Sequence, residues 1–234
     1  MNLFYNSEIN LENKNFILSC NEHLHISKVL RKKINDKIYI TNGKGYLFET
    51  IIDRINSKAI YLKILDYKYK PPMDYNLNIG IAPTKKIDRF EWFVEKAVEI
   101  GVSSITPIIC AHSERKKLNY SRLNKIAVSA MKQSLQTYLP EINPIVKVED
   151  FISLNTANQN YIAHCKRSKT QYLSNIIVKN SCSSVIIGPE GGFTDNEINL
   201  ALDFNFKAVS LGDNRLRTET AGTVCCQMFL DSNK

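Results

Sequence analysis

The stretch VIIGPEGGFTDNE, residues 185–197, is the part of the sequence that indicates the fold class most clearly. Its three β-branched residues predict a buried strand, which runs directly into the glycine loop 188–192. Thr194 followed by Glu197 is the pattern of a capping box, and it predicts that a helix begins there. The order strand, glycine loop, helix is typical of an α/β domain, in which ligands bind at the carboxyl ends of the strands.

A second stretch with the same order is VSLGDNRLRTETAG, residues 209–222. Glu219 suits the start of the last helix, whereas Arg215 and Arg217 oppose the helix dipole, which indicates that the arginines serve another purpose. A purely structural interpretation stays open for each loop. The first could be a tight strand-to-helix turn, and the second a solvated salt-bridge turn. The loop 188–192 has neither the G-x-G-x-x-G nor the P-loop pattern, so neither of those nucleotide sites is predicted there.

Strands and helices alternate before these loops, which predicts a mostly parallel sheet with helices on both faces. One helix is expected to begin at Asp88 as its N-cap, with Glu91 three residues on, and to end at Gly101. A second is expected to begin at Ser121 and to end before Pro140. The predicted strands of this part are residues 76–82, 103–109, 160–163, 184–187 and 208–211.

The first part of the chain is predicted to be a smaller, β-rich domain. Strands are expected at residues 37–41, 46–52 and 59–65, with Asn42-Gly43 as the signal of a hairpin turn between the first two. A helix is expected over residues 23–33, with Leu24, Val29 and Leu30 facing inward. The two prolines at 71–72 favour an extended connection, so we place the two domains at residues 1–70 and 74–234.

The composition favours a folded protein with an acidic partner. Hydrophobic residues make up 44% of the 234 residues, which rules out a wholly disordered chain. No apolar run approaches the roughly 18 residues of a membrane span, and no secretory signal is visible, so a cytoplasmic protein is expected. The net charge of +8 favours nucleic acid, with solubility as the alternative. Because the charge is +4 through Asp74 (12 − 8) and +4 after it (19 − 15), the fold must assemble any nucleic-acid surface.

Cysteine and histidine give no sign of a metal site. The six cysteines include no C-x-x-C pair, and Cys225-Cys226 lies in an apolar run typical of buried thiols. His23 and His25 form an H-x-H pair, but no carboxylate or cysteine cluster joins them. No metal is therefore expected.

At the two loops the sequence resembles the ribosomal RNA small subunit methyltransferase E family. Residues 188–197 are similar to its "GPEGG-F-…-E" motif and residues 211–221 to its "LG…LRTETA" motif. Residues 96–102, KAVEIGV, are similar to its "K-A-x-E-L-G-V" helix end, and Gln133-Ser134 followed by Pro140 to its "EQS…P" segment. His25, residues 29–31 and residues 42–45 resemble its "H…VLR…dG-G" pattern. The chain departs from the family pattern at Lys132, Gln136, Asn214 and Arg215.

The resemblance implies an S-adenosylmethionine-dependent enzyme of the SPOUT superfamily that methylates N3 of a uridine, uracil-1498, in 16S rRNA of the small ribosomal subunit. It implies an N-terminal PUA-like β-barrel that binds RNA and a C-terminal SPOUT α/β domain with a trefoil knot. It also implies a homodimer. The cofactor-binding residues that it implies are Ala163, His164, Gly188, Glu190, Gly191, Gly192, Leu211, Gly212, Leu216, Thr220 and Ala221.

The uracil N3 must lose its proton, and the charge that spreads to O2 and O4 must be stabilised. Arg217 is our candidate for the stabilising cation because a guanidinium stays charged, and Glu219 could orient Arg217 or accept the proton. Four basic residues of the first domain are assigned to RNA binding, with a solvated helix face as the alternative. They are Lys28, Arg31, Lys32 and Lys33.

Two other functions stay open from the sequence. One is a non-catalytic RNA-binding or assembly protein of the same fold, which would not bind S-adenosylmethionine. The other is a SPOUT methyltransferase that acts on another RNA or another atom, such as a ribose hydroxyl. Mass spectrometry of the modified nucleosides separates the two enzyme functions.

Overall fold

The computed structural model describes residues 2–19, 21–165 and 170–234. The chain forms two compact units. Unit 1 is Met1–Pro72 with Met131–Leu139, and unit 2 is Met73–Ala130 with Pro140–Lys234. The first passage between the units follows the two prolines, and the chain returns to unit 1 for the short segment Met131–Leu139.

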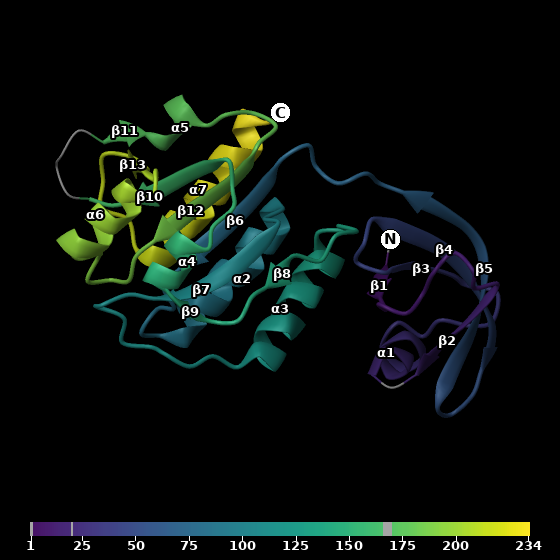
Figure 1. Ribbon diagram of the computed structural model, residues 1–234. Helices are drawn as coiled ribbons and strands as arrows, with labels where there is room; N and C mark the ends of the chain where they lie inside the picture. Colours follow the sequence, from purple (N-terminus) through teal and green to yellow (C-terminus); the bar gives the residue numbers. More distant parts are fainter. Residues whose placement is uncertain (1, 20, 166–169) are drawn as a thin grey trace. The chain divides into compact units, whose positions relative to one another are not determined.

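Unit 1 is built on a curled five-stranded sheet with the order β1-β3-β4-β5-β2 (Figure 1). β1 runs parallel to β3, and the other neighbours are antiparallel. Its core is apolar and fully buried, as shown by Ile40, Phe48 and Ile60 at 0–1% exposure. The elements are β1 (Leu3–Tyr5), β2 (Asn15–Ser19), α1 (Asn21–Leu24), the π-helix η1 (His25–Val29), β3 (Lys37–Thr41), β4 (Tyr46–Ile55) and β5 (Ala59–Tyr69).

The three strands predicted for this part are confirmed, but the predicted helix over residues 23–33 is wrong. A short α-helical turn leads into the π-helix, and Arg31 then adopts a left-handed conformation with φ 52° that ends the helical path. The wider π-helical turn changes which side chains face inward. Ile26 is fully buried, whereas Val29, expected to face inward, is 66% exposed.

The returning segment Met131–Leu139 holds the turn between β3 and β4. The Gly45 N–H donates to the Thr137 carbonyl at 2.9 Å, and the Leu139 N–H donates to the Gly43 carbonyl at 3.0 Å. Lys132, one of the departures from the family pattern, forms an ion pair with Glu22 at 2.8 Å. This lysine therefore has a structural partner within unit 1.

Unit 2 contains a sheet with the order β11-β13-β10-β12-β6-β7-β8, and β9 also pairs with β7 (Figure 1). All of these pairs are parallel, as predicted. The elements are β6 (Asn76–Ile81), α2 (Ile87–Ile100), β7 (Ser104–Ile109), α3 (Tyr120–Gln133, which passes into unit 1 at Met131), β8 (Glu141–Ile142), β9 (Val146–Lys147), α4 (Val148–Ser153), β10 (Gln159–Ala163), β11 (Gln171–Tyr172), α5 (Leu173–Ile176), β12 (Cys182–Ile187), α6 (Asp195–Asp203), β13 (Lys207–Ser210) and α7 (Thr218–Ser232).

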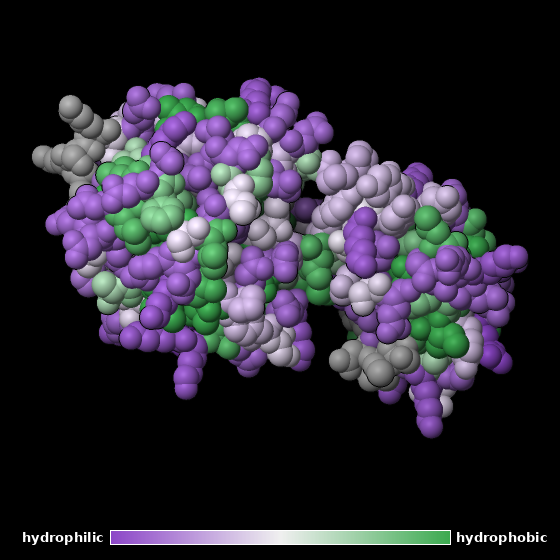
Figure 2. Space-filling view, in the orientation of Figure 1, coloured by the Kyte–Doolittle hydropathy of each residue, from purple (hydrophilic) through white to green (hydrophobic). Residues whose placement is uncertain are grey.

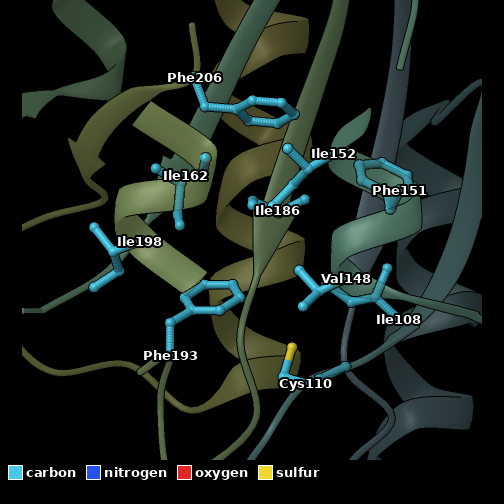
Figure 3. Packing of buried hydrophobic residues seen from close by; sticks show 12 residues of the cluster. Ile108, Cys110, Val148, Phe151, Ile152, Ile162, Ile186, Phe193, Ile198 and Phe206 are labelled. Carbon is cyan, nitrogen blue, oxygen red and sulfur yellow. The ribbon is translucent and has the colours of Figure 1, made fainter. Parts of the chain in front are cut away.

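Helices cover both faces of this sheet. A Cβ on Gly80 of β6 would lie 2.8 Å from Phe151 of α4, whereas the next residue, Ile81, reaches Gly222 of α7. Consecutive strand residues point to opposite faces, so α4 and α7 cover opposite faces. α6 packs with α4, and α2 and α5 pack with α7. Figure 3 shows the α4–α6 side, where Ile162 and Ile186 of two central strands face Phe193 and Val148.

Two of the expected helix N-caps are wrong, whereas the third N-cap and the expected C-terminal glycine are confirmed. Helix α2 has Lys86 as its N-cap, and Glu91 binds Arg122 through both carboxylate oxygens at 2.5 and 2.7 Å. Helix α3 begins one residue before Ser121, and Asn119 Oδ1 accepts from the Arg122 N–H. The capping box at Thr194 and the left-handed Gly101 at the end of α2 are both present.

The surface of each unit is mainly hydrophilic on the face seen in Figure 2, with separate apolar areas. No helix among the described residues is long and apolar enough to cross a membrane.

Cys225 and Cys226 are buried in α7 as predicted, and burial raises the pKa of both thiols. In the described part of the chain, no group of three or more His, Cys, Asp or Glu could hold a metal ion.

Candidate functional site

Three loops of unit 2 meet at one edge of the sheet because their strands are direct neighbours. β10 lies between β12 and β13, and Ala163 at its end pairs with Ile187 on one side and with Val209 on the other. The loops that follow these strands therefore start side by side. They contain the residues predicted to bind the cofactor, so the register of three parallel strands places distant parts of the sequence together.

Two hydrogen bonds join the loop after β12 to the segment after β13. The Thr218 hydroxyl donates to the Gly188 carbonyl at 3.0 Å, and Arg215 Nη2 donates to the Glu190 carbonyl at 3.1 Å. Arg215, a departure from the family pattern, thus holds the glycine loop directly. These bonds bring the start of α7 across the end of β10 to the loop after β12.

The loops after β6 and β7 close the other side of the glycine loop. The Lys85 N–H donates to the Glu190 carboxylate at 3.0 Å, and His112 Nδ1 lies 3.0 Å from the Gly192 carbonyl oxygen, to which it donates. A Cβ on Gly191 would lie 2.9 Å from the Cβ of His112. Only glycine therefore fits at this position without a shift of the loop or of the histidine.

The buried Glu197 fixes the helix that follows the glycine loop. Its Oε2 accepts from the Thr194 N–H at 2.7 Å and its Oε1 from the Ala111 N–H at 2.7 Å. One carboxylate thus caps α6 and also binds the loop after β7. This second role explains why a 4% exposed carboxylate is retained here.

Glu219 and Arg217, the two proposed catalytic residues, lie in different environments. Glu219 is 6% exposed, its Oε1 lies 3.6 Å from Arg89 Nε of α2, and its Oε2 has no hydrogen-bond partner within the described residues. Arg217 is exposed at the N-cap of α7, and its guanidinium contacts no hydrogen-bond or ion-pair partner in the described part of the chain. The structure thus gives Glu219 a different arginine as its partner.

The edge of the sheet where the loops after β10, β12 and β13 begin, which we call the loop edge, has the open space and the free hydrogen-bond donors that a cofactor requires. A Cβ on Gly192 or Gly212 would meet no atom within 4 Å, and both residues have positive φ angles of 73° and 148°. The backbone N–H groups of Gly191 and Leu216 donate no hydrogen bond to the described residues. Free backbone donors beside glycine are suited to bind a nucleoside group, so the residues present fit S-adenosylmethionine.

The remaining predicted residues lie along the same edge or in the other unit. The His164 N–H donates to the Val209 carbonyl at 3.3 Å, which places this residue beside β13. Leu211, Thr220 and Ala221 lie in the loop after β13 and in the first turn of α7. The four basic residues predicted to bind RNA belong to unit 1, where Lys28, Arg31 and Lys33 are exposed and Lys32 is half-buried.

Sequence reasoning missed the residues that surround the glycine loop. Arg115 donates to the carbonyls of Thr84 and Lys85 at 3.1 and 2.7 Å, and so supports the loop that binds Glu190. Lys85 also pairs with Glu114, and this hydrogen bond raises the pKa of the lysine. These residues follow two predicted strands, so the rule that sites lie at carboxyl strand ends could have found them.

A hydrogen bond fixes the loop after β13 on its outer side. The Tyr172 hydroxyl of β11 donates to Asp213, and this bond raises the pKa of the tyrosine. β11 itself pairs with β13. The segment 211–217 is therefore held at Asp213 and again at Arg215.

Comparisons with known proteins agree with this geometry. Residues 71–230 match the model of an RNA methyltransferase domain, and residues 23–65 match that of an RNA methyltransferase PUA domain. The chain is 30% identical to ribosomal RNA small subunit methyltransferase E of Rickettsia conorii over 94% of this chain and 90% of the relative.

Solved structures give the same result for the fold. A "probable rRNA-methyltransferase" of Porphyromonas gingivalis is 36% identical, with a TM-score of 0.91, over 97% of this chain and 96% of the other. Ribosomal RNA small subunit methyltransferase E of Neisseria gonorrhoeae, solved with bound S-adenosylmethionine, is 27% identical, with a TM-score of 0.82, over 97% and 95%.

Proposed function

The chain belongs to the ribosomal RNA small subunit methyltransferase E family, and we propose that it methylates N3 of uracil-1498 in 16S rRNA with S-adenosylmethionine as the methyl donor. RNA methyl transfer is the activity of the family. One observation carries the assignment of the site. The two loops with the family's motifs are joined by hydrogen bonds at one sheet edge, beside the end of β10.

The residues that would hold the cofactor are those of the three loops. They provide free N–H donors at Gly191 and Leu216, and open space at Gly192 and Gly212. When bound, S-adenosylmethionine supplies an electrophilic methyl group on a sulfonium. The protein's part is to hold the uracil N3 in line with that methyl group and to manage the proton that N3 carries.

Arg217 stabilises the negative charge that develops on O2 and O4 of the uracil as N3 loses its proton. This role is supported by its guanidinium, which is exposed within the motif segment 211–221 and is free to meet a substrate. Glu219 accepts the proton. Its carboxylate is buried, and the unpartnered Oε2 retains its capacity as an acceptor. The role of orienting Arg217 is less supported, because Arg89 is the ion-pair partner of Glu219.

The fold and assembly belong to the same proposal. We propose that the curled sheet of unit 1 is a PUA-like barrel that binds RNA, and that unit 2 is a SPOUT domain. The trefoil knot is supported by the return of residues 211–218 across the end of β10 to the loop after β12. A homodimer that acts in the cytoplasm follows from the family resemblance, and sedimentation of the protein at micromolar concentration tests the dimer.

Variants at the two catalytic residues test the mechanism. Arg217→Ala and Glu219→Gln should keep the affinity for S-adenosylmethionine, measured by calorimetry, because neither side chain is assigned to the cofactor. Transfer of labelled methyl groups to 16S rRNA should fall by about 100-fold or more in each. Glu219→Gln should regain activity as the pH rises, since hydroxide from the solvent then takes the N3 proton in place of the carboxylate.

Lys207→Ala is the matched control, because Lys207 is an exposed cation at the amino end of β13, opposite the site. It should methylate at the rate of the unmodified protein. If Arg217→Ala matches this control, the stabilising role is wrong. If Glu219→Gln shows the pH profile of the unmodified protein, another group takes the proton.

A further inference from the structure

Tyrosine rings gather at one end of the unit 1 sheet, where β4 begins and β5 ends. Tyr46 pairs across the strands with Tyr69, and Phe48 with Tyr67, so all four rings project from the same face. Phe48 is buried in the core at 1% exposure, whereas Tyr67 and Tyr69 are 51% and 52% exposed. The core of unit 1 thus continues outward as rings that face water.

The rings form a connected surface. The centroids of Tyr46 and Tyr69 are 4.8 Å apart in a tilted arrangement, and those of Tyr46 and Tyr67 are 6.2 Å apart, edge to face. Tyr138, from the segment Met131–Leu139, adds a fourth tyrosine, with its hydroxyl 2.9 Å from the Lys70 carbonyl and 3.4 Å from the Tyr69 hydroxyl. We call Tyr46, Tyr67, Tyr69 and Tyr138 the tyrosine surface.

The Tyr138 hydroxyl of this surface stays neutral near pH 7. Burial, followed by the hydrogen bond with Tyr69, raises the pKa of Tyr138 to about 12. A neutral ring does not repel a phosphate backbone. This property agrees with an acidic ligand.

Two exposed lysines lie beside the tyrosine surface. Lys44 forms a β-bridge with Tyr138, and the Lys70 N–H donates to the carbonyl of Gly45 at 2.9 Å. Neither lysine has an ion-pair partner among the described residues, so both charges are available to a ligand. The nearby acid Asp66 accepts from the N–H of Tyr67, and its charge reduces the local excess.

A hollow of about 390 Å³ adjoins the first of these tyrosines. It is lined by Tyr46, by Leu11, which is 50% exposed, by the amides Asn10 and Asn42, and by the acidic Glu12. Asn42 Oδ1 accepts from the Lys44 N–H, and its amide nitrogen donates to no described residue. An aromatic wall with an amide donor beside it is suited to a planar group that carries hydrogen-bond acceptors, such as a nucleobase.

We infer that the tyrosine surface binds unpaired RNA, with bases stacked on Tyr67 and Tyr69 and phosphates held by Lys44 and Lys70. Exposed aromatic rings on a sheet, flanked by unpaired lysines, have the chemistry with which proteins bind single strands, because every base offers a face for stacking. Bases inside a duplex are already stacked, so duplex RNA should bind much more weakly there. The inference takes its substrate class, RNA, from the proposed function, but it assigns a site separate from the cluster Lys28–Lys33.

The test uses the full chain and a fluorescein-labelled strand of twelve uridines, with binding measured by anisotropy. Tyr67→Ala and Tyr69→Ala should each weaken binding about tenfold. Tyr67→Phe and Tyr69→Phe should bind like the unmodified protein, because stacking needs the ring and not the hydroxyl. Leu65→Ala is the control, since Leu65 is a 46% exposed apolar residue of the same strand.

The inference is overturned if the alanine variants bind like Leu65→Ala, or if the phenylalanine variants lose as much affinity as the alanine variants. Thermal unfolding of each variant checks that unit 1 remains folded, and the phenylalanine variants keep the test valid if an alanine variant is unstable. Lys44→Gln and Lys70→Gln should each flatten the dependence of log affinity on log salt by about 0.7. An unchanged salt slope in both would remove the lysines from the site.

The outcome is separable from that of the proposed function. If the protein does not methylate 16S rRNA but the tyrosine variants lose oligouridine binding, the proposed function fails and the site stands. If methylation occurs and the tyrosine variants bind oligouridine normally, only the inferred site is wrong.

Discussion

At the scale of single residues, the glycine loop depends on a contact that its motif does not reveal. Gly191 lies against His112, a residue of the loop after β7, and a Cβ added to this glycine would lie 2.9 Å from the histidine Cβ. The two residues are 79 positions apart in the chain, so no local pattern links them. The requirement for glycine at this position therefore comes at least partly from the protein itself, before any ligand is considered.

Gly191→Ala should weaken S-adenosylmethionine binding about tenfold, because overpacking displaces the loop at a cost of about 1–3 kcal/mol. The same substitution in a His112→Gly background should cost little, since the opposing Cβ is gone. Calorimetric affinities of the four proteins give the comparison. Equal costs of Gly191→Ala in both backgrounds would show that His112 is not the cause.

At the scale of elements, strands and the helix starts near the motifs could be predicted from local sequence. The strand ends of β6, β7, β10, β12 and β13 lie within two residues of the predicted ranges, because continuous apolar runs mark buried parallel strands. The caps of α2 and α3 could not be predicted. Glu91 has the spacing of a capping residue but binds Arg122, 31 positions away, and such a tertiary partner overrides a local pattern.

Helix α7, whose first turn carries the end of the second motif, packs closely against α2. A Cβ on Gly222 would lie 2.4 Å from the Phe93 ring. Gly222→Ala should destabilise the protein by about 1–3 kcal/mol through overpacking, although alanine favours a helix by about 1 kcal/mol over glycine. Chemical denaturation measures the change, with Thr223→Ala, at the next position of the helix, as the control. An increase in the free energy of unfolding would mean that α2 and α7 can move apart without loss of packing energy.

At the scale of the whole molecule, the sequence predicted two domains but not the return of the chain to the first. Residues 131–139 follow a helix of unit 2, and nothing in their composition indicates that they hold the turn at Gly43 and Gly45 of unit 1. The same limit applies to the site. The motifs predicted the two glycine-containing loops. Arg89, His112 and Arg115 could not be predicted as neighbours of these loops, because only the order of the strands in the sheet brings them there.

The net charge of +8 is expected to favour RNA binding where basic side chains gather on the surface of a folded unit. Replacing Lys28, Arg31, Lys32 and Lys33 with glutamine should weaken RNA binding and lower the salt slope by up to about 3 for a single strand. A variant with four exposed lysines of unit 2 replaced serves as the control for net charge. These lysines are Lys125, Lys147, Lys179 and Lys207. If both variants change the slope equally, the cluster is not a specific RNA surface.

We propose above that the three loops of unit 2 transfer a methyl group to N3 of uracil-1498. The most direct measurement incubates the protein with unmodified 16S rRNA or small subunits and methyl-labelled S-adenosylmethionine, followed by mass spectrometry of the nucleosides and of the fragment that contains uracil-1498. We predict labelled 3-methyluridine at that position. Label in a ribose-methylated nucleoside, label at another position, or no label at all would contradict the claim.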